Sequence, residues 1–423
     1  MKDKGINLLK GYKDFDCEIV TDLSRENLLL KLPEFDGITL RRGKIDREIL
    51  SKCDKLKVIA RHGVGYDSVD TKCLKEKGIT LLVAHNSTST SPAEHIMFMI
   101  MNIYKGVSMF DTMVRNGDFV KAIHLNIEQN FELFDKTVLI AGFGRIGKKL
   151  IKKCLGFDMK VLVFDPYVDD VTIASFGGVK IASLEEGLKK ADILSLSLPL
   201  SDETKNFITL KELKLMKKSS IVINAARGGA FVKAIHLNIE QNFELFNKTV
   251  LIAGFGRIGK KLIKKCLGFD MKVLVFDPYV DDVTIKSFGG AKVTTLEEGL
   301  KKADILSLSL PLNSETKNFI TLKEMKLMKK SSIIINAARG GVVNEEDLNN
   351  ALDNNIIAFA GIDVFEKEPP ESTNPLITNK KVVLSPHSAT FTKEGLESMA
   401  VETAQNIIDF FENKIENTKI VKL

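Results

Sequence analysis

The stretch TVLIAGFGRIG occurs twice in this chain of 423 residues, at positions 137–147 and again at positions 249–259. Each occurrence opens with an apolar run that is typical of a buried strand, and its glycines separate that run from a helical pattern. Strand-like and helix-like segments of this kind alternate along most of the chain. The fold class that we predict is therefore α/β, built on parallel sheets.

The two stretches belong to a long internal repeat. Residues 119–229 recur as residues 231–341 at a constant offset of 112, with ten differences. A solenoid unit is only ~20–50 residues long, so we interpret the repeat as one segment of a domain copied in tandem. The differing pairs are Asp135/Asn247, Ala174/Lys286, Val179/Ala291, Ile181/Val293, Ala182/Thr294, Ser183/Thr295, Ser201/Asn313, Asp202/Ser314, Leu213/Met325 and Val222/Ile334.

The composition predicts a globular cytoplasmic protein. Residues are 44% hydrophobic and 27% charged, and the 61 basic and 55 acidic residues are interleaved, which disfavours a nucleic-acid partner. The first residues carry no apolar signal segment, and no apolar run is long enough to span a bilayer. The five cysteines form no CxxC pair, as is typical of reduced thiols. We predict no membrane partner and no metal site.

Each glycine loop has the spacing of a dinucleotide-binding turn. In the second copy, Gly254 allows a tight turn, Gly256 lets the backbone approach a pyrophosphate, and Gly259 allows close packing of helix and strand. The phosphates would lie at the N-terminus of the helix that begins with Arg257 and Ile258. A glycine turn kept for packing alone is the simpler alternative.

An acidic residue, Asp277, follows the last glycine of the loop by 18 residues, at the end of the next predicted strand. An acid at this position hydrogen-bonds ribose hydroxyls and repels a 2′-phosphate, so the pattern favours NAD over NADP. The first copy repeats the whole arrangement and is a second possible cofactor site. Its residues are Gly142, Gly144, Arg145, Ile146, Gly147 and Asp165.

Three polar residues follow strand-like runs farther along the chain. Arg339 lies in the run NAARGG, Glu368 in DVFEKEP and His387 in SPHSAT. Open α/β sheets bind their ligands at the carboxyl ends of their strands, which is where these side chains are predicted to lie. Glu366 is the alternative acid in its run, and a lone His after a strand is more often a core residue.

These runs, in this order after the glycine loop and its Asp, resemble the D-2-hydroxyacid dehydrogenases, the family of D-3-phosphoglycerate dehydrogenase. The resemblance implies a Rossmann-type NAD-binding domain and a flavodoxin-like substrate domain. It further implies that His387 acts as acid/base, that Glu368 hydrogen-bonds it, and that Arg339 holds the substrate carboxylate and carbonyl. The chemistry agrees, because His can protonate a nascent alkoxide near neutral pH and Arg is a permanent forked donor.

The resemblance also implies further contacts to the cofactor and to the substrate. The additional cofactor-binding residues would be Pro311, Ala338 and Asp363. In the run RHGVGYDSVD, backbone N–H groups around Val64 and Gly65 would hold the substrate carboxylate. Arg41 falls where phosphoglycerate enzymes place a phosphate-contacting Arg, although a solvated basic loop is an equal alternative.

The repeat allows two arrangements of the chain. In the favoured arrangement, the segment after residue 341 completes the second copy, because this requires no long excursion of the chain. The predicted domains are then a substrate domain (1–118 and 389–423), an incomplete NAD-binding half-domain (119–230) and a complete NAD-binding domain (231–388). In the alternative, that segment completes the first copy, and Arg227 replaces Arg339.

The predicted function is hydride transfer between NAD(H) and a small D-2-hydroxy acid or 2-oxo acid, such as 3-phosphoglycerate or hydroxypyruvate/glyoxylate. Two alternatives remain at this point, an NAD-sensing binding protein and a nucleotide-binding but catalytically inactive duplication product. In relatives, two nucleotide domains pack together across a homodimer. The same pairing could form here between two chains, or within one chain as a pseudo-dimer of the two copies.

Overall fold

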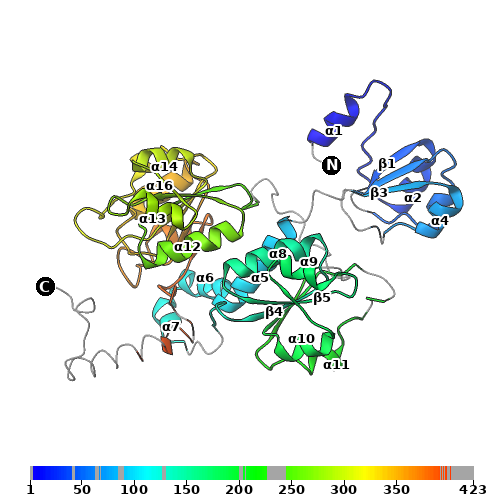
Figure 1. The fold of residues 1–423 in the computed structure, drawn as a ribbon. Coiled ribbons are helices and arrows are strands. Elements are labelled where there is room, and N and C mark those ends of the chain that lie inside the picture. The colour runs from blue at the N-terminus through cyan, green and yellow to red at the C-terminus, as the bar shows by residue number, and fades with distance from the viewer. Residues whose placement is uncertain are drawn as a thin grey trace. The chain divides into compact units, whose positions relative to one another are not determined.

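The computed structural model describes residues 3–40, 43–61, 66, 68–83, 90–125, 130–199, 203–204, 206–225, 244–390, 392, 394, 396–397 and 401. The chain forms two compact units, and each is described by itself. The first unit comprises residues 1–92 with 198–207, and the second comprises residues 93–197 with 208–423. Figure 1 shows the elements of both units along the chain.

The first unit contains a three-stranded parallel sheet in the order β1-β2-β3. Its elements are α1 (Asp3–Lys10), α2 (Arg25–Lys31), the short 3₁₀ helix η1 (Leu32–Glu34), β1 (Gly37–Leu40), α3 (Arg47–Ser51), β2 (Val58–Arg61), α4 (Thr71–Lys77) and β3 (Thr80–Val83). The side chains of Asp46 and Asp70 cap the N-termini of α3 and α4. Each accepts a hydrogen bond from a backbone N–H group of the first turn, which has no partner within the helix. Leu50 and Ile59 are fully buried in the core of this unit.

Three helices follow, α5 (Thr90–Lys105), α6 (Val107–Arg115) and α7 (Phe119–Ile123). The sequence predicts one helix from about residue 91 to about residue 114, and that prediction is wrong at Gly106. This glycine has a φ of 61° in the left-handed region, where the absence of a side chain makes the conformation accessible. The break separates α5 from α6, which packs against β15 (Val382–Leu384).

The first copy forms a five-stranded parallel sheet in the order β6-β5-β4-β7-β8. Its elements are β4 (Thr137–Ala141), α8 (Arg145–Gly156), β5 (Lys160–Phe164), α9 (Asp170–Ser175), β6 (Val179–Lys180), α10 (Leu184–Lys190), β7 (Ile193–Leu196), α11 (Leu210–Leu213) and β8 (Ile221–Asn224). Helices α8 and α10 cover opposite faces of this sheet (Figure 1). Strand β8 is its edge within the described part of the chain.

The second copy forms a seven-stranded parallel sheet in the order β11-β10-β9-β12-β13-β14-β15. Its elements are β9 (Thr249–Ala253), α12 (Arg257–Gly268), β10 (Lys272–Phe276), α13 (Asp282–Ser287), β11 (Ala291–Lys292), α14 (Leu296–Lys302), β12 (Ile305–Leu308), α15 (Leu322–Met325), β13 (Ile333–Asn336), α16 (Glu345–Asp353), β14 (Phe359–Ile362), α17 (Pro375–Thr378) and β15 (Val382–Leu384). Because β9 lies between β10 and β12, the strand order reverses at the glycine loop, where sheets of this type bind ligands.

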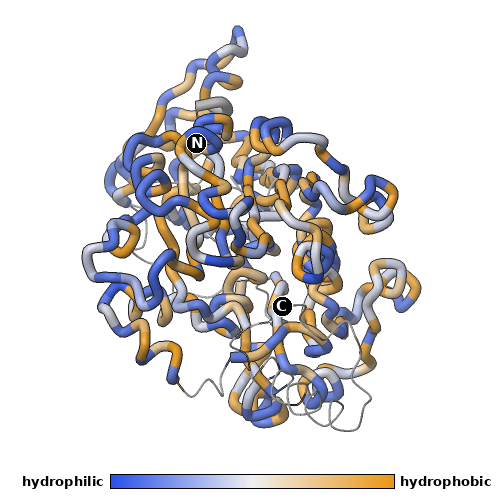
Figure 2. Tube along the Cα trace, turned by 90° about the vertical axis from the view of Figure 1, so that its left-hand side faces the viewer, coloured by the Kyte–Doolittle hydropathy of each residue, from blue (hydrophilic) through white to orange (hydrophobic). Residues whose placement is uncertain are grey.

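Hydrophobic and hydrophilic residues alternate over short distances along the chain (Figure 2). The apolar side chains gather into one core in the first unit and two in the second. All five cysteines are free thiols, and Cys53, Cys73, Cys154 and Cys266 are buried. None of the described helices combines the length and the apolar character that crossing a membrane requires.

Arg115, the last residue of α6, fixes the end of the seven-stranded sheet. Its guanidinium donates to the carbonyl oxygen of Ile377 at 2.7 Å and to that of Val382, the first residue of β15. Asp111 accepts hydrogen bonds from Arg115 at 2.8 Å and from the backbone N–H of Leu384 at 2.9 Å. Helix α6 therefore closes the β15 edge with charge-assisted hydrogen bonds.

We expect Arg115→Met to lower the free energy of unfolding by about 1.5–3 kcal/mol, the range for hydrogen bonds to charged groups. Met keeps the apolar stem and removes the donors, so the loss reports on the hydrogen bonds. Urea unfolding followed by circular dichroism measures it, with Lys121→Met on the exposed face of α7 as the control. Equal midpoints for the two variants would contradict the assignment.

Candidate active site

The glycine loop of the second copy joins β9 to α12 with two close approaches of backbone and one open position. Gly254 has a φ of 96°, and a Cβ on it would lie 2.5 Å from the carbonyl oxygen of Ser309. A Cβ on Gly259 would lie 2.4 Å from the carbonyl oxygen of Gly254. Neither position accepts a side chain. A Cβ on Gly256 meets no atom within 4 Å, so this side of the loop is open to a ligand that approaches the backbone.

Asp277, at the end of β10, lies against the same loop. Its carboxylate accepts hydrogen bonds from the backbone N–H of Phe255 at 2.7 Å and of Tyr279 at 2.9 Å. The acid is half-buried beside the first turn of α12, where Arg257 and Ile258 are both exposed. An oxygen of a carboxylate has more than one lone pair, so Asp277 can hold the loop and also accept from a ribose hydroxyl.

The glycine loop of the first copy has the same local geometry. Asp165 accepts from the backbone N–H of Phe143 at 2.7 Å, and a Cβ on Gly147 would lie 2.4 Å from the carbonyl oxygen of Gly142. Arg145 differs, because its Nη1 atom is buried without a hydrogen-bond partner among the described residues. The main difference between the copies lies beyond the loop, since the described sheet of the first copy has no strands after β8.

The run NAARGG follows β13 as a tightly held loop. The side chain of Asn336 accepts from the backbone N–H of Ala338 at 3.1 Å and donates to the carbonyl oxygen of Arg339 at 3.0 Å. A Cβ on Gly340 would lie 1.8 Å from the carbonyl oxygen of Phe365, so the loop touches the segment that follows β14. The loop that carries the exposed Arg339 therefore lies next to the run DVFEKEP, and the guanidinium of Arg339 donates to the carbonyl oxygen of Ala338 at 2.6 Å.

A hydrogen bond joins the side chains of His387 and Glu368, which lie on the segments that follow β15 and β14. The Nδ1 atom of His387 lies 2.8 Å from Oε2 of Glu368, while Oε1 of Glu368 accepts from the backbone N–H of Phe365 at 3.0 Å. The hydrogen bond from Phe365 to Oε1 therefore holds the carboxylate in place, so that Oε2 faces the imidazole. The Nε2 atom makes no hydrogen bond with any residue that the structure describes, so it is available to a substrate.

Asp363 holds the turn that carries His387. Its buried carboxylate accepts hydrogen bonds from the hydroxyl of Ser385 at 2.6 Å and from the backbone N–H of Ser388 at 2.8 Å and of Ala389 at 3.1 Å. The backbone N–H of His387 donates to the carbonyl oxygen of Asp363 at 2.7 Å. These bonds maintain a φ of 53° at His387, an uncommon value for a residue with a side chain.

Glu366 has a different set of contacts from Glu368. Its carboxylate accepts from the backbone N–H of Glu345, the first residue of α16, and its own backbone N–H donates to the carboxylate of Glu345 at 2.5 Å. The side chain of Asn374 also donates to Glu345, whose pKa is raised by burial. Glu366 thus anchors the loop to α16, and only Glu368 of the two contacts His387.

The remaining predicted residues are accounted for as follows. Pro311 is exposed after β12, and its carbonyl oxygen accepts from the hydroxyl of Thr316 at 2.6 Å. The described residues contain no cluster of three or more His, Cys, Asp or Glu that could hold a metal ion. The predicted substrate contacts and the alternative arginine lie outside the described residues, and these are Arg41, Val64, Gly65 and Arg227.

Sequence reasoning missed three residues that shape this site, Asn336, Ser385 and Glu345. Asn336 and Ser385 are the first residues of the runs NAARGG and SPHSAT, each at the end of a predicted strand. A polar residue at that position could have indicated a role in the site. Asn336 is buried and Ser385 is half-buried, and both side chains find hydrogen-bond partners within the site, as polar groups withdrawn from water generally do. Glu345 gave no such signal, because it resembles an ordinary acidic first turn of a helix.

Comparison with known proteins gives a consistent picture. The model of the family described as D-isomer specific 2-hydroxyacid dehydrogenase, NAD binding domain, matches residues 97–239 and again residues 236–389. The D-3-phosphoglycerate dehydrogenase of Methanocaldococcus jannaschii is 34% identical over 215 residues, covering 51% of this chain and 40% of that protein. The glyoxylate reductase of Pyrococcus furiosus is 26% identical over 427 residues, covering 99% of this chain and 93% of that protein.

Among solved structures, the apo form of D-mandelate dehydrogenase from Rhodotorula graminis is 20% identical, with a TM-score of 0.39 and coverage of 92% of this chain and 86% of that one. This chain spans about half the length of the first phosphoglycerate dehydrogenases that it matches. The family match confirms the predicted family, the α/β fold class and NAD as the cofactor. Because that match covers more than half of its residues, the chain belongs to the D-isomer specific 2-hydroxyacid dehydrogenase family.

Proposed function

We propose that the chain is an NAD-dependent oxidoreductase that transfers a hydride between NAD(H) and a small D-2-hydroxy acid or 2-oxo acid. The observation that carries this proposal is the hydrogen bond between His387 and Glu368, together with the Arg339 loop, which touches the segment that follows β14. A proton donor, its orienting carboxylate and a forked cation follow three neighbouring strands, β13, β14 and β15. This is the set of groups that reduction of a 2-oxo acid requires.

The residues of the second copy fit NAD. The loop is open at Gly256, the N–H groups of α12 begin directly after it, and Asp277 lies where ribose hydroxyls would bind. We further assign Arg257, Ile258, Pro311 and Ala338 to the cofactor contacts. Asp363 is assigned to the cofactor contacts as well, because its Oδ2 atom accepts only from the backbone N–H of Ala389 and keeps a second lone pair.

When bound, NADH supplies the hydride that the carbonyl carbon of the 2-oxo acid accepts. Arg339 binds the substrate carboxylate, since a guanidinium matches a carboxylate with two parallel donors. His387 delivers a proton from Nε2 to the carbonyl oxygen as negative charge develops there, and the neutral alcohol leaves. Glu368 keeps Nδ1 protonated and stabilises the imidazolium before transfer. In the oxidative direction the same Nε2 accepts the proton of the hydroxyl group.

We infer that residues 231–388 are the complete NAD-binding domain, that residues 119–230 are an incomplete half-domain, and that residues 1–118 with 389–423 form the substrate domain. The sheet order supports this division, because β14 and β15 continue the sheet of the second copy. The catalytic arginine is then Arg339, and Arg227 is its counterpart in a copy without the strands that bear Glu368 and His387.

The names of the relatives suggest which substrates to test first, namely 3-phosphohydroxypyruvate, hydroxypyruvate and glyoxylate. Oxidation of NADH by purified protein, followed by absorbance, measures turnover, and titration calorimetry measures NAD binding separately. Turnover of at least one 2-oxo acid is the expected result. Measurable NAD binding without turnover of any of them would favour an NAD-sensing protein or an inactive duplication product instead.

We expect His387→Ala to reduce kcat by about 10²–10⁴-fold, the usual contribution of general acid–base catalysis, with NAD affinity nearly unchanged. Glu368→Gln should lose a smaller part of that factor, because Gln keeps a hydrogen bond to Nδ1 and loses the charge. His95→Ala, an exposed histidine of α5, and Glu366→Gln are the matched controls. Unchanged turnover in His387→Ala would show that this residue serves packing alone.

The variants Asp277→Arg and Asp165→Arg distinguish the contributions of the two glycine loops to NAD binding. They place the same bulky charge at equivalent positions. The first change should raise the KM for NAD about 10–100-fold, as expected for a lost charge-assisted hydrogen bond. The second should have little effect, and it controls for damage to the loop because both acids hold the same backbone donors. A reversed result would make the first copy and Arg227 the catalytic pair, and equal effects would indicate coupled copies.

A further inference from the structure

Strand β8, the last strand of the first copy, is an open edge of its sheet. It pairs with β7 on one side, and none of the described strands pairs with its other side. Edges of sheets are usually short, charged or covered, because an unprotected edge pairs readily with another polypeptide. The opposite edge, β6, is two residues long and includes Lys180. Strand β8, in contrast, has four residues, IVIN, and carries no charge.

The second copy shows the equivalent edge in an occupied state. Its closing segment, which we define as residues 342–365, contains α16 and β14. The backbone N–H of Ala358 donates to the carbonyl oxygen of Ser332 at 2.9 Å. The backbone N–H of Asp363 donates to the carbonyl oxygen of Asn336 at 3.0 Å. These bonds hold the segment at both ends of β13, and α16 packs on α15.

The closing segment also buries apolar side chains of the surface beneath it. Met325 of α15 and Ile334 of β13 are fully buried. They share one cluster with apolar residues of the segment, which are Leu348, Ala351, Leu352, Ile357, Ala360 and Ile362. The occupant of this surface is therefore a helix with an apolar face, followed by an apolar strand.

The first copy presents the same surface in an open state. Leu213 of α11 and Val222 of β8, the equivalents of Met325 and Ile334, are exposed. Among the large apolar side chains described in both copies, these two are exposed in the first copy and buried in the second. Asn224 is likewise exposed, whereas its equivalent in the second copy is buried. The chain thus contains one docking surface twice, with and without its occupant.

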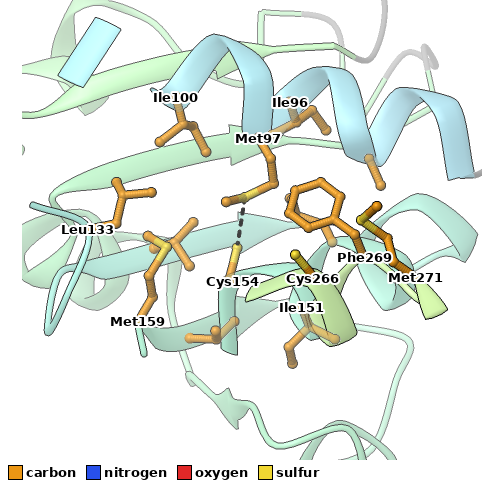
Figure 3. Close-up of a cluster of buried hydrophobic side chains, with 14 of the residues drawn as sticks. Ile96, Met97, Ile100, Leu133, Ile151, Cys154, Met159, Cys266, Phe269 and Met271 are labelled. Atoms are coloured by element: carbon orange, nitrogen blue, oxygen red, sulfur yellow. Dashed lines mark hydrogen bonds between the residues drawn. The ribbon is translucent and has the colours of Figure 1, made fainter. Parts of the chain in front are cut away.

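The opposite side of the first copy is already covered. Cys154 of α8 lies in a buried cluster to which both copies and α5 contribute (Figure 3). Its thiol lies 3.7 Å from the sulfur of Met97 in α5. Other members of the cluster are Ile96, Ile100, Leu133, Ile151, Met159, Cys266, Phe269 and Met271. Because this side is buried, a partner of the first copy has access to β8 and α11 instead.

The charges on the two sides favour an acidic occupant. The closing segment contains no Lys or Arg, and its five acidic residues are Glu345, Glu346, Asp347, Asp353 and Asp363. Beside β8, the first copy exposes four lysines, Lys211, Lys214, Lys217 and Lys218. Lys217 is paired with Asp192 at 2.7 Å. At low salt, a surface of this sign attracts an acidic segment and speeds its association.

We propose that β8 and α11 form a docking site for an acidic helix–strand segment of another polypeptide. The strand of that segment adds in parallel to the outer edge of β8, and its helix packs on α11, as the closing segment does on β13 and α15. The chain's own closing segment is engaged on β13, so the occupant comes from outside the chain. This inference concerns polypeptide binding and is independent of the proposed catalytic residues.

A peptide with the sequence of residues 342–365 is the probe, because the second copy shows this segment docked. Fluorescence anisotropy of the labelled peptide with the full-length chain should show saturable binding of one peptide per chain, weakened by salt. Hydrogen exchange at the backbone amides of residues 221–224 should become slower when the peptide is added. No saturable binding, or protection that does not include β8, would overturn the proposal.

A charge on β8 tests where the peptide binds. Val222→Asp should weaken binding at least about tenfold, because it places an unpaired charge where apolar residues of the segment pack. Val179→Asp, at an exposed position of the opposite edge β6, is the matched control and should leave the affinity unchanged. Equal affinities for the two variants, or two peptides bound per chain, would show exchange with the closing segment on β13 and would contradict the proposed site.

A conservative pair of substitutions maintains the test if Val222→Asp fails to fold. Leu213→Met with Val222→Ile gives the first copy the side chains that contact the closing segment in the second. The added methylene group of Ile should tighten binding about fourfold. An affinity that does not increase would count against docking on β8.

A variant peptide separates apolar docking from charge attraction. Leu348→Asp with Leu352→Asp removes the apolar face of the helix and should abolish binding, although the peptide becomes more acidic. If this peptide binds as tightly as the unaltered one, the contact is electrostatic alone and the proposed docking on α11 is wrong.

Discussion

Two sheet edges of nearly the same sequence compete in this chain for one pair of closing strands. Strand β13 pairs with β14 in parallel, with Ile333 opposite Phe359, while its equivalent β8 is an edge of the described structure. The chain from residue 224 to residue 359 is roughly six times longer than that from residue 336, which disfavours the other pairing by about 1.5 kcal/mol of loop-closure entropy. The candidate site depends on this choice, because Arg339, Glu368 and His387 follow β13, β14 and β15.

Most strands were predictable from the sequence, and the reason is local. A buried parallel strand is a short apolar run with a turn after it, and β4 and β9 coincide with the apolar run that opens each TVLIAGFGRIG stretch. The break at Gly106 was not predictable, because the apolar pattern continues through it and a single glycine is tolerated in a helix. What separates α5 from α6 is what each packs against: α5 lies in the apolar cluster that contains strands of both copies, whereas α6 packs against β15, and that information is absent from either segment alone.

The candidate site shows the same division between local and distant information. The motifs and the family resemblance led to the prediction of Arg339, Glu368 and His387, with Glu366 as the alternative acid of its run. The contact of Glu366 with the start of α16 leaves Glu368 for that role, and this contact joins segments about twenty residues apart. The sequence left open whether the two copies pair within one chain or between two chains, and it gave no sign that α8 and α12 are the helices in contact.

Two of the ten differences between the copies can be explained by this choice of strand pairing. Leu213 and Val222 of the first copy are 43% and 39% exposed, whereas their equivalents Met325 and Ile334 are fully buried. In the second copy, α16 packs on α15 and β14 pairs with β13, and these elements cover the positions that the first copy leaves open. An open apolar edge favours association with other chains. The first copy therefore depends for its stability on its opposite side, where α5 and the shared core of α8 and α12 bury its remaining apolar surface.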